Sequence, residues 1–74
     1  MEFYRGRVLG LKDTYTTIRL SSVMGIESFS VVNPSGGFDE GVKFRFSDGS
    51  STVVADTYEK VDQILRGEEE YKHL

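Results

Sequence analysis

Apolar and basic residues alternate along residues 42–46, and this is the clearest secondary-structure signal in the chain. Successive side chains of an extended strand point to opposite faces, so alternation indicates a strand with one buried face. Three apolar residues share one face and two basic residues share the other: Val42, Phe44 and Phe46 against Lys43 and Arg45. We therefore predict a strand whose apolar face lies in the core.

A tight turn is expected next, because an Asp-Gly pair at residues 48–49 is typical of a two-residue type I′ turn. A turn of that length would place Phe44 opposite Val53 on the returning strand. It would likewise place Val42 opposite Ala55. We therefore predict a β-hairpin in which these four side chains form one apolar patch.

A helix is predicted after the hairpin, because the apolar residues there recur at helical spacing and would form one stripe: Tyr58, Val61, Ile64 and Leu65. The helix is expected to begin after Asp56 or Thr57, and Asp56 with Glu59 has the spacing of a capping box. Its end is expected at about Arg66, because Gly67 is suited to the C-cap. The stripe would then lie on the apolar patch of the hairpin.

The N-terminal half predicts three more strands, at residues 3–12, 15–20 and 26–32. Gly6 and Gly10 interrupt the first strand, and a glycine inside a strand indicates a bulge or a close approach of another backbone. Between the second and third strands we expect a single turn, helical in form. The third strand should contain a bulge or bend, because Ile26 and Phe29 have opposite parity.

The long loop of the chain is predicted at residues 33–41, NPSGGFDEG. An apolar aromatic residue in such a loop either folds back onto the core or is offered to a partner, and we favour the first for Phe38. The loop is Gly-rich, yet it matches neither phosphate-binding glycine motif and carries two acids, so we do not interpret it as a phosphate site.

These elements predict an α+β fold, with one small antiparallel sheet of four or five strands and one C-terminal helix packed on one face. The chain has 74 residues, which is one domain, with residues 1–66 as its folded part and residues 67–74 as an acidic tail. The predicted core consists of Leu9, Ile18, Leu20, Val23, Ile26, Val42, Phe44, Val53, Ala55, Tyr58, Val61, Ile64 and Leu65.

Candidate catalytic chemistry is sparse. The chain has no Cys, so it has neither a disulfide nor a thiolate ligand, and its single His, His73, is next to last. Nucleophilic catalysis needs a nucleophile, a base and an orienting group held together, and no such set is visible. We therefore expect a non-enzyme, with no catalytic residue, no cofactor and no metal site.

Charge is unevenly distributed in this chain of net charge −3. Residues 1–20 hold four cations against two acids, whereas residues 56–74 hold six acids against three cations. Such polarity can orient a partner or a second copy. We expect a protein-binding module, namely a regulator, adaptor or inhibitor of a partner protein, with a phage or other mobile element as a possible source. The candidate contact residues are Phe38, Asp39, Glu40, Tyr15, Arg19, Lys43 and Arg45.

Nucleic-acid binding is the alternative function. Five cations could line one sheet surface beside Tyr15 if their strands were neighbours: Arg5, Arg7, Arg19, Lys43 and Arg45. Cations interleaved with aromatic residues on a sheet can hold single-stranded nucleic acid. The pI near 5.0 argues against this function, because such domains are usually basic.

We favour a homodimer over a monomer, because a small core and exposed sheet edges both favour self-association. The first strand has apolar residues of both parities and could bury Tyr4 or Val8 at a two-fold interface. The competing expectation is a monomer in which that strand is central. The sequence shows no signal peptide and no apolar run long enough to span a membrane. We therefore expect a cytoplasmic protein that has no membrane partner.

Residues 17–66 resemble the small flagellar FlbD-like proteins. The resemblance rests on a strand and turn (IRLSSVMGIES), a strand ending in a polar Asp-Gly turn (VKFRFSDGSS), a short strand (TVVAD) and a helix (TYEKVDQIL). The outline is also similar to the first half of LytTR-type DNA-binding domains, whose second half this chain lacks. The FlbD resemblance implies a small regulatory or adaptor protein that acts through a protein partner.

Overall fold

Five strands and one α-helix make up the fold, which is α+β as predicted. The structure is a computed structural model, and it describes residues 2–67. The elements are β1 (Phe3–Arg7), β2 (Tyr15–Arg19), a 3-10 turn η1 (Leu20–Ser22), β3 (Val23–Val32), β4 (Phe38–Phe46), β5 (Ser51–Val54) and α1 (Tyr58–Arg66). The predicted acidic tail and His73 lie outside the described residues, apart from Gly67.

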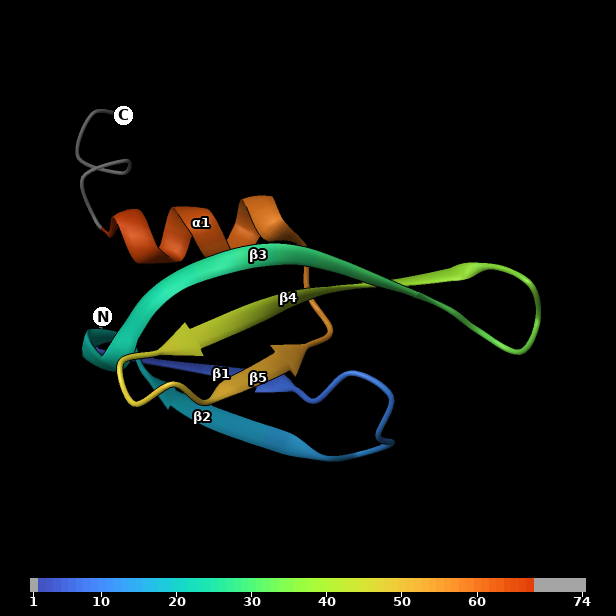
Figure 1. Ribbon diagram of the computed structural model, residues 1–74, viewed down its shortest axis with the longest axis horizontal. Coiled ribbons are helices and arrows are strands. Elements are labelled where there is room, and N and C mark those ends of the chain that lie inside the picture. Colours follow the sequence, from blue (N-terminus) through green and yellow to red (C-terminus); the bar gives the residue numbers. More distant parts are fainter. Residues whose placement is uncertain (1, 68–74) are drawn as a thin grey trace.

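The prediction of a single sheet is wrong, because the strands are divided between two antiparallel sheets, β1–β2 and β3–β4–β5 (Figure 1). A short seam joins them, in which Val8 pairs with Val54. The Leu9 amide donates to the Val53 carbonyl at 3.1 Å, and the Ala55 amide donates to the Arg7 carbonyl at 2.7 Å. The first strand is therefore much shorter than residues 3–12, because the backbone turns from the β1–β2 hairpin to β5 after Val8, whose amide still donates to the Thr14 carbonyl at 2.8 Å.

The core lies between the two sheets and is completed by α1, which packs against β3 and β4. The buried residues are Tyr4, Ile18, Val42, Phe44, Val54 and Val61, and the hydrophobic residues packed against them are Leu20, Val23, Ile26, Phe46, Ile64 and Leu65. Most of the predicted core is thus confirmed, whereas Leu9 is only half-buried and lies outside this cluster. The prediction that Tyr58 belongs to the core is wrong, because this residue lies in the first turn of the helix and is 41% exposed.

The β4–β5 hairpin differs from the prediction by one residue. The Phe46 amide donates to Ser50 and the Gly49 amide donates to the Phe46 carbonyl, so the turn has three residues and not two. Asp48 does not have the positive φ of a type I′ turn, whereas Gly49 does, at 92°. The Asp48 carboxylate accepts from both the amide and the hydroxyl of Ser50, which closes the longer turn and lowers the pKa of Asp48.

The extra turn residue reverses the faces of β5. Val42 pairs with Val54 and Phe44 with Thr52, where Ala55 and Val53 were expected. A one-residue shift moves every side chain to the opposite face of a strand, so Val54 is buried and Val53 only half-buried. Val53 and Ala55 are therefore wrong as core predictions, although the hairpin itself is confirmed.

The start of α1 is set by Thr57, whose hydroxyl accepts from the Lys60 amide at 3.3 Å. The capping box between Asp56 and Glu59 does not form. The Asp56 carboxylate accepts instead from the Thr57 amide and from the Tyr4 hydroxyl, at 2.9 and 2.7 Å. The helix ends at Arg66, as predicted, and Gly67 follows with a φ of 78°.

The longest hairpin of the fold is β3–β4, and its outer part is the element that the sequence analysis missed. Residues 38–41 were predicted as loop, yet they extend β4 and pair with β3 from Val32↔Phe38 to Phe29↔Gly41. The loop is only residues 33–37. The predicted strand bulge lies earlier than expected, between Val23 and Gly25. We call residues 28–41 the arm.

Candidate protein-interaction surfaces

The arm projects from the body of the molecule without a third strand beside it (Figure 1). The pairing of β4 with β5 stops at Val42↔Val54, where Gly41 begins the arm. A Cβ at Gly41 would lie 2.7 Å from the Val54 carbonyl oxygen, so glycine allows β5 to end against β4 here. Beyond this point, both edges of the two-stranded arm carry backbone groups that no strand pairs.

The tip of the arm is organised by Asn33. Its side-chain oxygen accepts from the Ser35 and Gly37 amides, both at 3.0 Å, and its side-chain nitrogen donates to Asp39 at 3.2 Å. Its backbone amide donates to the Gly37 carbonyl at 2.9 Å. These bonds hold the two strands together at their far end, so the arm presents its side chains in a preorganised arrangement.

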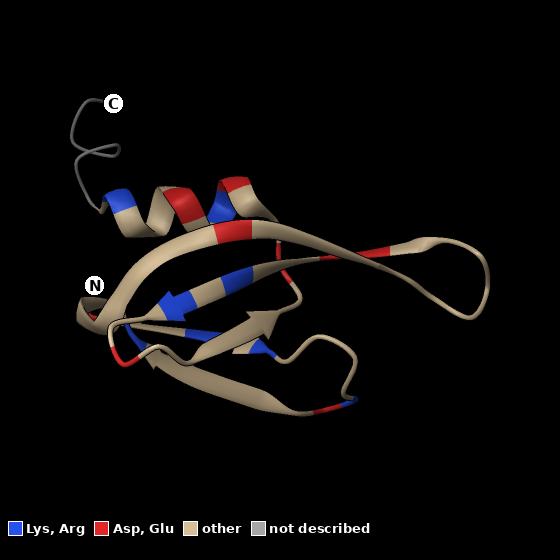
Figure 2. Ribbon diagram, viewed as in Figure 1, with Lys and Arg blue, Asp and Glu red and all other residues tan. Residues whose placement is uncertain are grey.

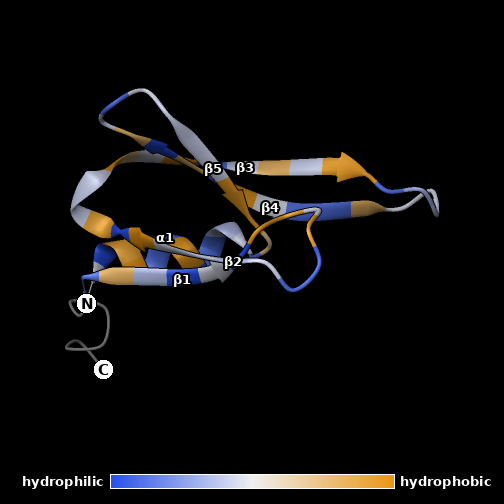
Figure 3. Cartoon of the chain, turned by 90° about the horizontal axis from the view of Figure 1, so that it is seen from below, coloured by the Kyte–Doolittle hydropathy of each residue, from blue (hydrophilic) through white to orange (hydrophobic). Residues whose placement is uncertain are grey.

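Both strands of the arm contain apolar residues (Figure 3), and the register places them on both faces. Val32 and Phe38 are opposite each other on the face that is continuous with the core, and they are 68% and 71% exposed. Phe29 and Val31 lie on the other face and are also exposed. The prediction that Phe38 folds back onto the core is therefore wrong, because β4 carries it away from the body.

The arm is also acidic. Between Glu27 and Val42 the sequence contains Glu27, Asp39 and Glu40 and no Lys or Arg (Figure 2). Asp39 and Glu40 are exposed on opposite faces of β4. The arm therefore combines exposed apolar residues with negative charge, which differs from the basic surfaces elsewhere in the molecule.

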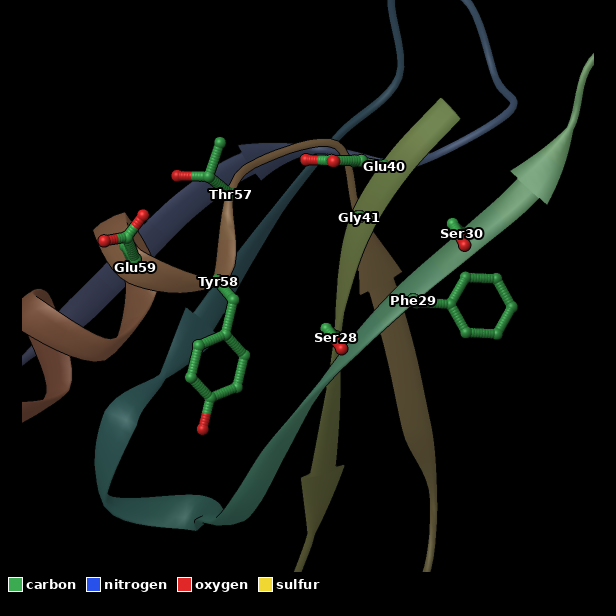
Figure 4. A pocket seen from close by; sticks show the side chains of 8 residues that line it. All are labelled: Ser28, Phe29, Ser30, Glu40, Gly41, Thr57, Tyr58 and Glu59. Carbon is green, nitrogen blue, oxygen red and sulfur yellow. The ribbon is translucent and has the colours of Figure 1, made fainter. Parts of the chain in front are cut away.

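A cleft lies where the arm meets the start of α1 (Figure 4). Its wall on the arm side is Ser28, Phe29, Ser30, Glu40 and Gly41, and its wall on the helix side is Thr57, Tyr58 and Glu59. Two carboxylates and several hydroxyls line it without a cation, so the cleft favours a donor-rich or cationic group over an anion. The ring of Phe29 points away from Tyr58 in this view.

A second surface of distinct chemistry is the outer face of β1–β2, which we call the basic face. Its six outward positions are Phe3, Arg5, Arg7, Tyr15, Thr17 and Arg19. The Arg5 guanidinium lies 5.0 Å from the centre of the Tyr15 ring, and that of Arg19 lies 5.6 Å from the centre of the Phe3 ring. No carboxylate of the described chain forms an ion pair with these arginines.

The predicted candidate residues are thus distributed over three places. Phe38, Asp39 and Glu40 lie on the arm, Tyr15 and Arg19 on the basic face, and Lys43 and Arg45 on the outer face of β4. Because the inner faces of the two sheets meet in the core, their outer faces point away from each other. The single surface of five cations does not form, since β4 is not a neighbour of β1 or β2.

Tyr4 and Val8 are not available to form the dimer interface that was predicted through one of them. Tyr4 is buried in its own core, where its ring lies 5.3 Å from that of Phe44. Val8 is half-buried at the seam, where it pairs with Val54. Both residues are therefore already covered by their own chain, and an interface between copies would need another surface.

No family model, curated protein or solved structure matches this chain. The resemblance to FlbD-like proteins therefore stays a prediction, and the surfaces must be interpreted from their own chemistry. Within residues 2–67, no group of three or more His, Cys, Asp or Glu side chains could hold a metal ion. In the same residues, no helix is long and apolar enough to cross a membrane.

The arm could have been found from one signal in the sequence. Residues 26–32 contain apolar residues of both parities, which we interpreted as a bulge. In the structure, this pattern extends the strand with apolar side chains on both faces. A strand of that kind lacks a single buried side, which is typical of a segment that a partner covers.

Proposed function

We propose that this chain is a protein-binding module that engages its partner through the arm. The observation that carries the proposal is the exposure of Val32 and Phe38, at 68% and 71%, opposite each other at the outer end of a two-stranded ribbon. A two-stranded ribbon is only marginally stable in water by itself, so a partner that covers it would add stability as well as contact.

The arm offers a protein partner two kinds of contact. The unpaired backbone edges can accept a further strand, and the exposed side chains supply apolar anchors beside it. Aromatic residues commonly contribute much of the affinity of an interface, and Phe38, the first residue of β4, is an exposed aromatic side chain of this kind. This geometry fits a regulator, adaptor or inhibitor that occupies a partner's surface. The resemblance to FlbD-like proteins implies a role of the same kind.

The proposed function does not include catalysis. Its one His is His73 and it has no Cys, so a nucleophile and its base would have to come from hydroxyls and carboxylates. The carboxylates of the cleft at the base of the arm lie beside Ser28, Ser30 and Thr57. These groups suit binding of a donor-rich segment of a partner, in keeping with a module that acts by occupancy.

Site-specific photo-crosslinking in the native host tests the proposal. A photoreactive phenylalanine analogue at position 38 should give discrete crosslinked protein bands that survive nuclease treatment. The matched control is the same analogue at position 24, because Met24 is 72% exposed against 71% for Phe38 and lies outside the arm. Equal band patterns at the two positions, or no band at position 38, would contradict binding through the arm.

The basic face supports a second candidate function, the binding of single-stranded nucleic acid. Two exposed rings with guanidinium groups over them form a surface on which bases could stack beside cations. Fluorescence anisotropy of single-stranded DNA and RNA at low salt tests it. Binding should weaken steeply with salt and with Arg5→Ala, and should tolerate Arg45→Ala. An unchanged anisotropy at low salt removes this candidate.

A further inference from the structure

We infer that the arm of one copy of this chain docks on the basic face of a second copy, and that the second arm returns the contact. This inference rests on the proposed function, because it names the partner of the same arm. Each copy carries both halves of the contact, so a two-fold arrangement would use two identical arm-to-face contacts and leave neither half exposed.

Charge is the first observation that points to a second copy. The arm carries Asp39 and Glu40 and no Lys or Arg, and Glu40 shares the face of Val32 and Phe38. The basic face carries three arginines without an acid among its outward positions. Complementary potentials fix the orientation of two surfaces and speed their encounter. The outer face of β4, with Lys43 and Arg45, has no aromatic residue at its outward strand positions to match the apolar part of the arm.

Apolar chemistry is the second observation. The most exposed apolar pair of the arm is Val32 and Phe38. The basic face displays two partly exposed rings, Tyr15 at 57% and Phe3 at 48%. Stacking this face of the arm on these rings would bury apolar area on both surfaces. It would also bring Glu40, which lies on the same face as Val32 and Phe38, toward the guanidinium groups. Aromatic and Arg side chains are the types enriched at the centres of protein interfaces.

The two surfaces also agree in size. Within residues 28–41 the arm has four residue pairs, from Val32↔Phe38 to Phe29↔Gly41, and β1 pairs with β2 over five residues. Four and five extended residues cover roughly 13 and 17 Å. One such contact is narrow, because the arm is only two strands wide. A reciprocal pair doubles the area and brings it closer to the ~800 Å² per partner of a stable interface.

Charge exchange between two variants tests this inference. The arm variant is Asp39→Lys with Glu40→Lys, and the face variant is Arg5→Glu with Arg19→Glu. Arg7 is left unchanged because it already lies across a shallow cleft from Asp39 and Glu40 of its own arm. Molar mass is measured by light scattering and sedimentation velocity from about ten to several hundred micromolar protein, at low and high salt, with circular dichroism as a check of folding.

The parent chain should approach twice its mass of 8.3 kDa over this range, and each variant alone should dimerise at least tenfold more weakly. A one-to-one mixture of the two variants should regain the dimer, because every arm then meets a face of opposite charge. Lys43→Glu with Arg45→Glu is the control of equal charge change and should leave dimerisation unaltered. If the arm variant misfolds, Phe38→Ser replaces it and should weaken the dimer without a charge change.

Three outcomes would overturn the inference. They are a parent chain that stays monomeric over the whole range, a dimer that both charge-reversed variants retain, and a mixture that fails to regain the dimer. A mass that rises beyond the dimer would also contradict the reciprocal arrangement, since an open head-to-tail contact continues without closing. A monomeric parent leaves the proposed function to be decided by the photo-crosslinking at position 38, so the two failures are distinguishable.

Discussion

Tyr4 joins three parts of the fold that are distant in sequence. Its ring packs on Phe44 of the other sheet, and its hydroxyl donates to Asp56 just before α1. The ring passes over Gly6, where a Cβ would lie 2.6 Å from the ring and hydroxyl atoms, so the glycine in β1 leaves room for it. The glycine in this strand indicated a bulge or a close approach of another backbone, whereas the space at Gly6 is taken by the Tyr4 side chain.

The pH dependence of stability should report the Tyr4 contact. Burial first, and then the hydrogen bond and the charge of Asp56, raise the pKa of Tyr4 above its ordinary value of about 10. A raised pKa in the folded state contributes stability that is complete below pH 10 and is lost as the pH rises further. We expect the free energy of unfolding, from urea melts, to fall above pH 10.

Tyr4→Phe is the control for that measurement, since it keeps the ring and removes the ionisable hydroxyl. The variant should be less stable than the parent at pH 7 by about 1–3 kcal/mol, because Asp56 loses a partly buried hydrogen bond. Its unfolding free energy should also fall less steeply above pH 10. Parallel pH profiles for the two proteins would contradict the role given to Tyr4.

Phe44 and Phe38 allow a matched comparison within one strand. Phe44→Ala should cost about 3–5 kcal/mol, because the side chain is fully buried and leaves a cavity. Phe38→Ala should change the stability of the monomer by less than about 0.5 kcal/mol, because the side chain is largely exposed. Urea melts at low micromolar concentration measure both, and similar losses at the two positions would place Phe38 against the body.

At the scale of elements, local patterns predicted the strands and the helix better than they predicted how strands pair. The alternation of residues 42–46 and the spacing of Val61, Ile64 and Leu65 are short-range signals, and the structure confirms both. The register of β5 depends on whether the turn has two or three residues. That choice rests on the bonds of Asp48 to Ser50, which the Asp-Gly pair alone does not reveal.

The arm escaped prediction for a related reason. Residues 38–41 have a polar, Gly-containing composition that is typical of loops, and their extended form comes from pairing with β3. Gly41 seemed to continue the loop, whereas its function is to let β5 approach β4 closely. Long-range pairing thus decided the structure of a segment whose local composition favoured another form.

Shortening the arm tests whether the body folds without it. Replacing residues 31–39 by Asn-Gly would close the hairpin directly after the Ser30↔Glu40 pair with a two-residue turn. No core side chain is removed, so the free energy of unfolding of the monomer should stay within about 1 kcal/mol of the parent. A loss of several kcal/mol in urea melts would show that the arm is part of the folding unit.

At the scale of the whole molecule, the division into two sheets controls where charge appears. The sequence suggested a surface of five cations, on the condition that their strands were neighbours. The seam through Val8 and Val54 joins the sheets so that β1–β2 and β4 expose their cations on different sides. Which strands become neighbours depends on contacts between residues far apart in the chain. The pattern of residues within a single strand carries no information about those contacts.

The same division separates the basic face from the acidic, apolar arm. The described chain contains two largely exposed surfaces of opposite character, which come together at a shallow cleft between Arg7 and the acids Asp39 and Glu40. Specific binding proteins often leave such surfaces open in the free state, because the groups that bind a partner cannot be used inside their own core. This arrangement supports the proposed function, in which the chain acts by occupying a partner's surface.

Hydrogen–deuterium exchange of the arm amides tests the central claim, that the arm is an interaction surface uncovered by its own chain. In dilute protein, near one micromolar, amides of residues 29–32 and 38–41 should exchange much faster than those of Phe44 and Val54. At several hundred micromolar, exchange in the arm should slow while exchange in the core stays the same. Arm amides as protected as Phe44 in dilute protein would contradict the claim, because the arm would then be packed on its own body.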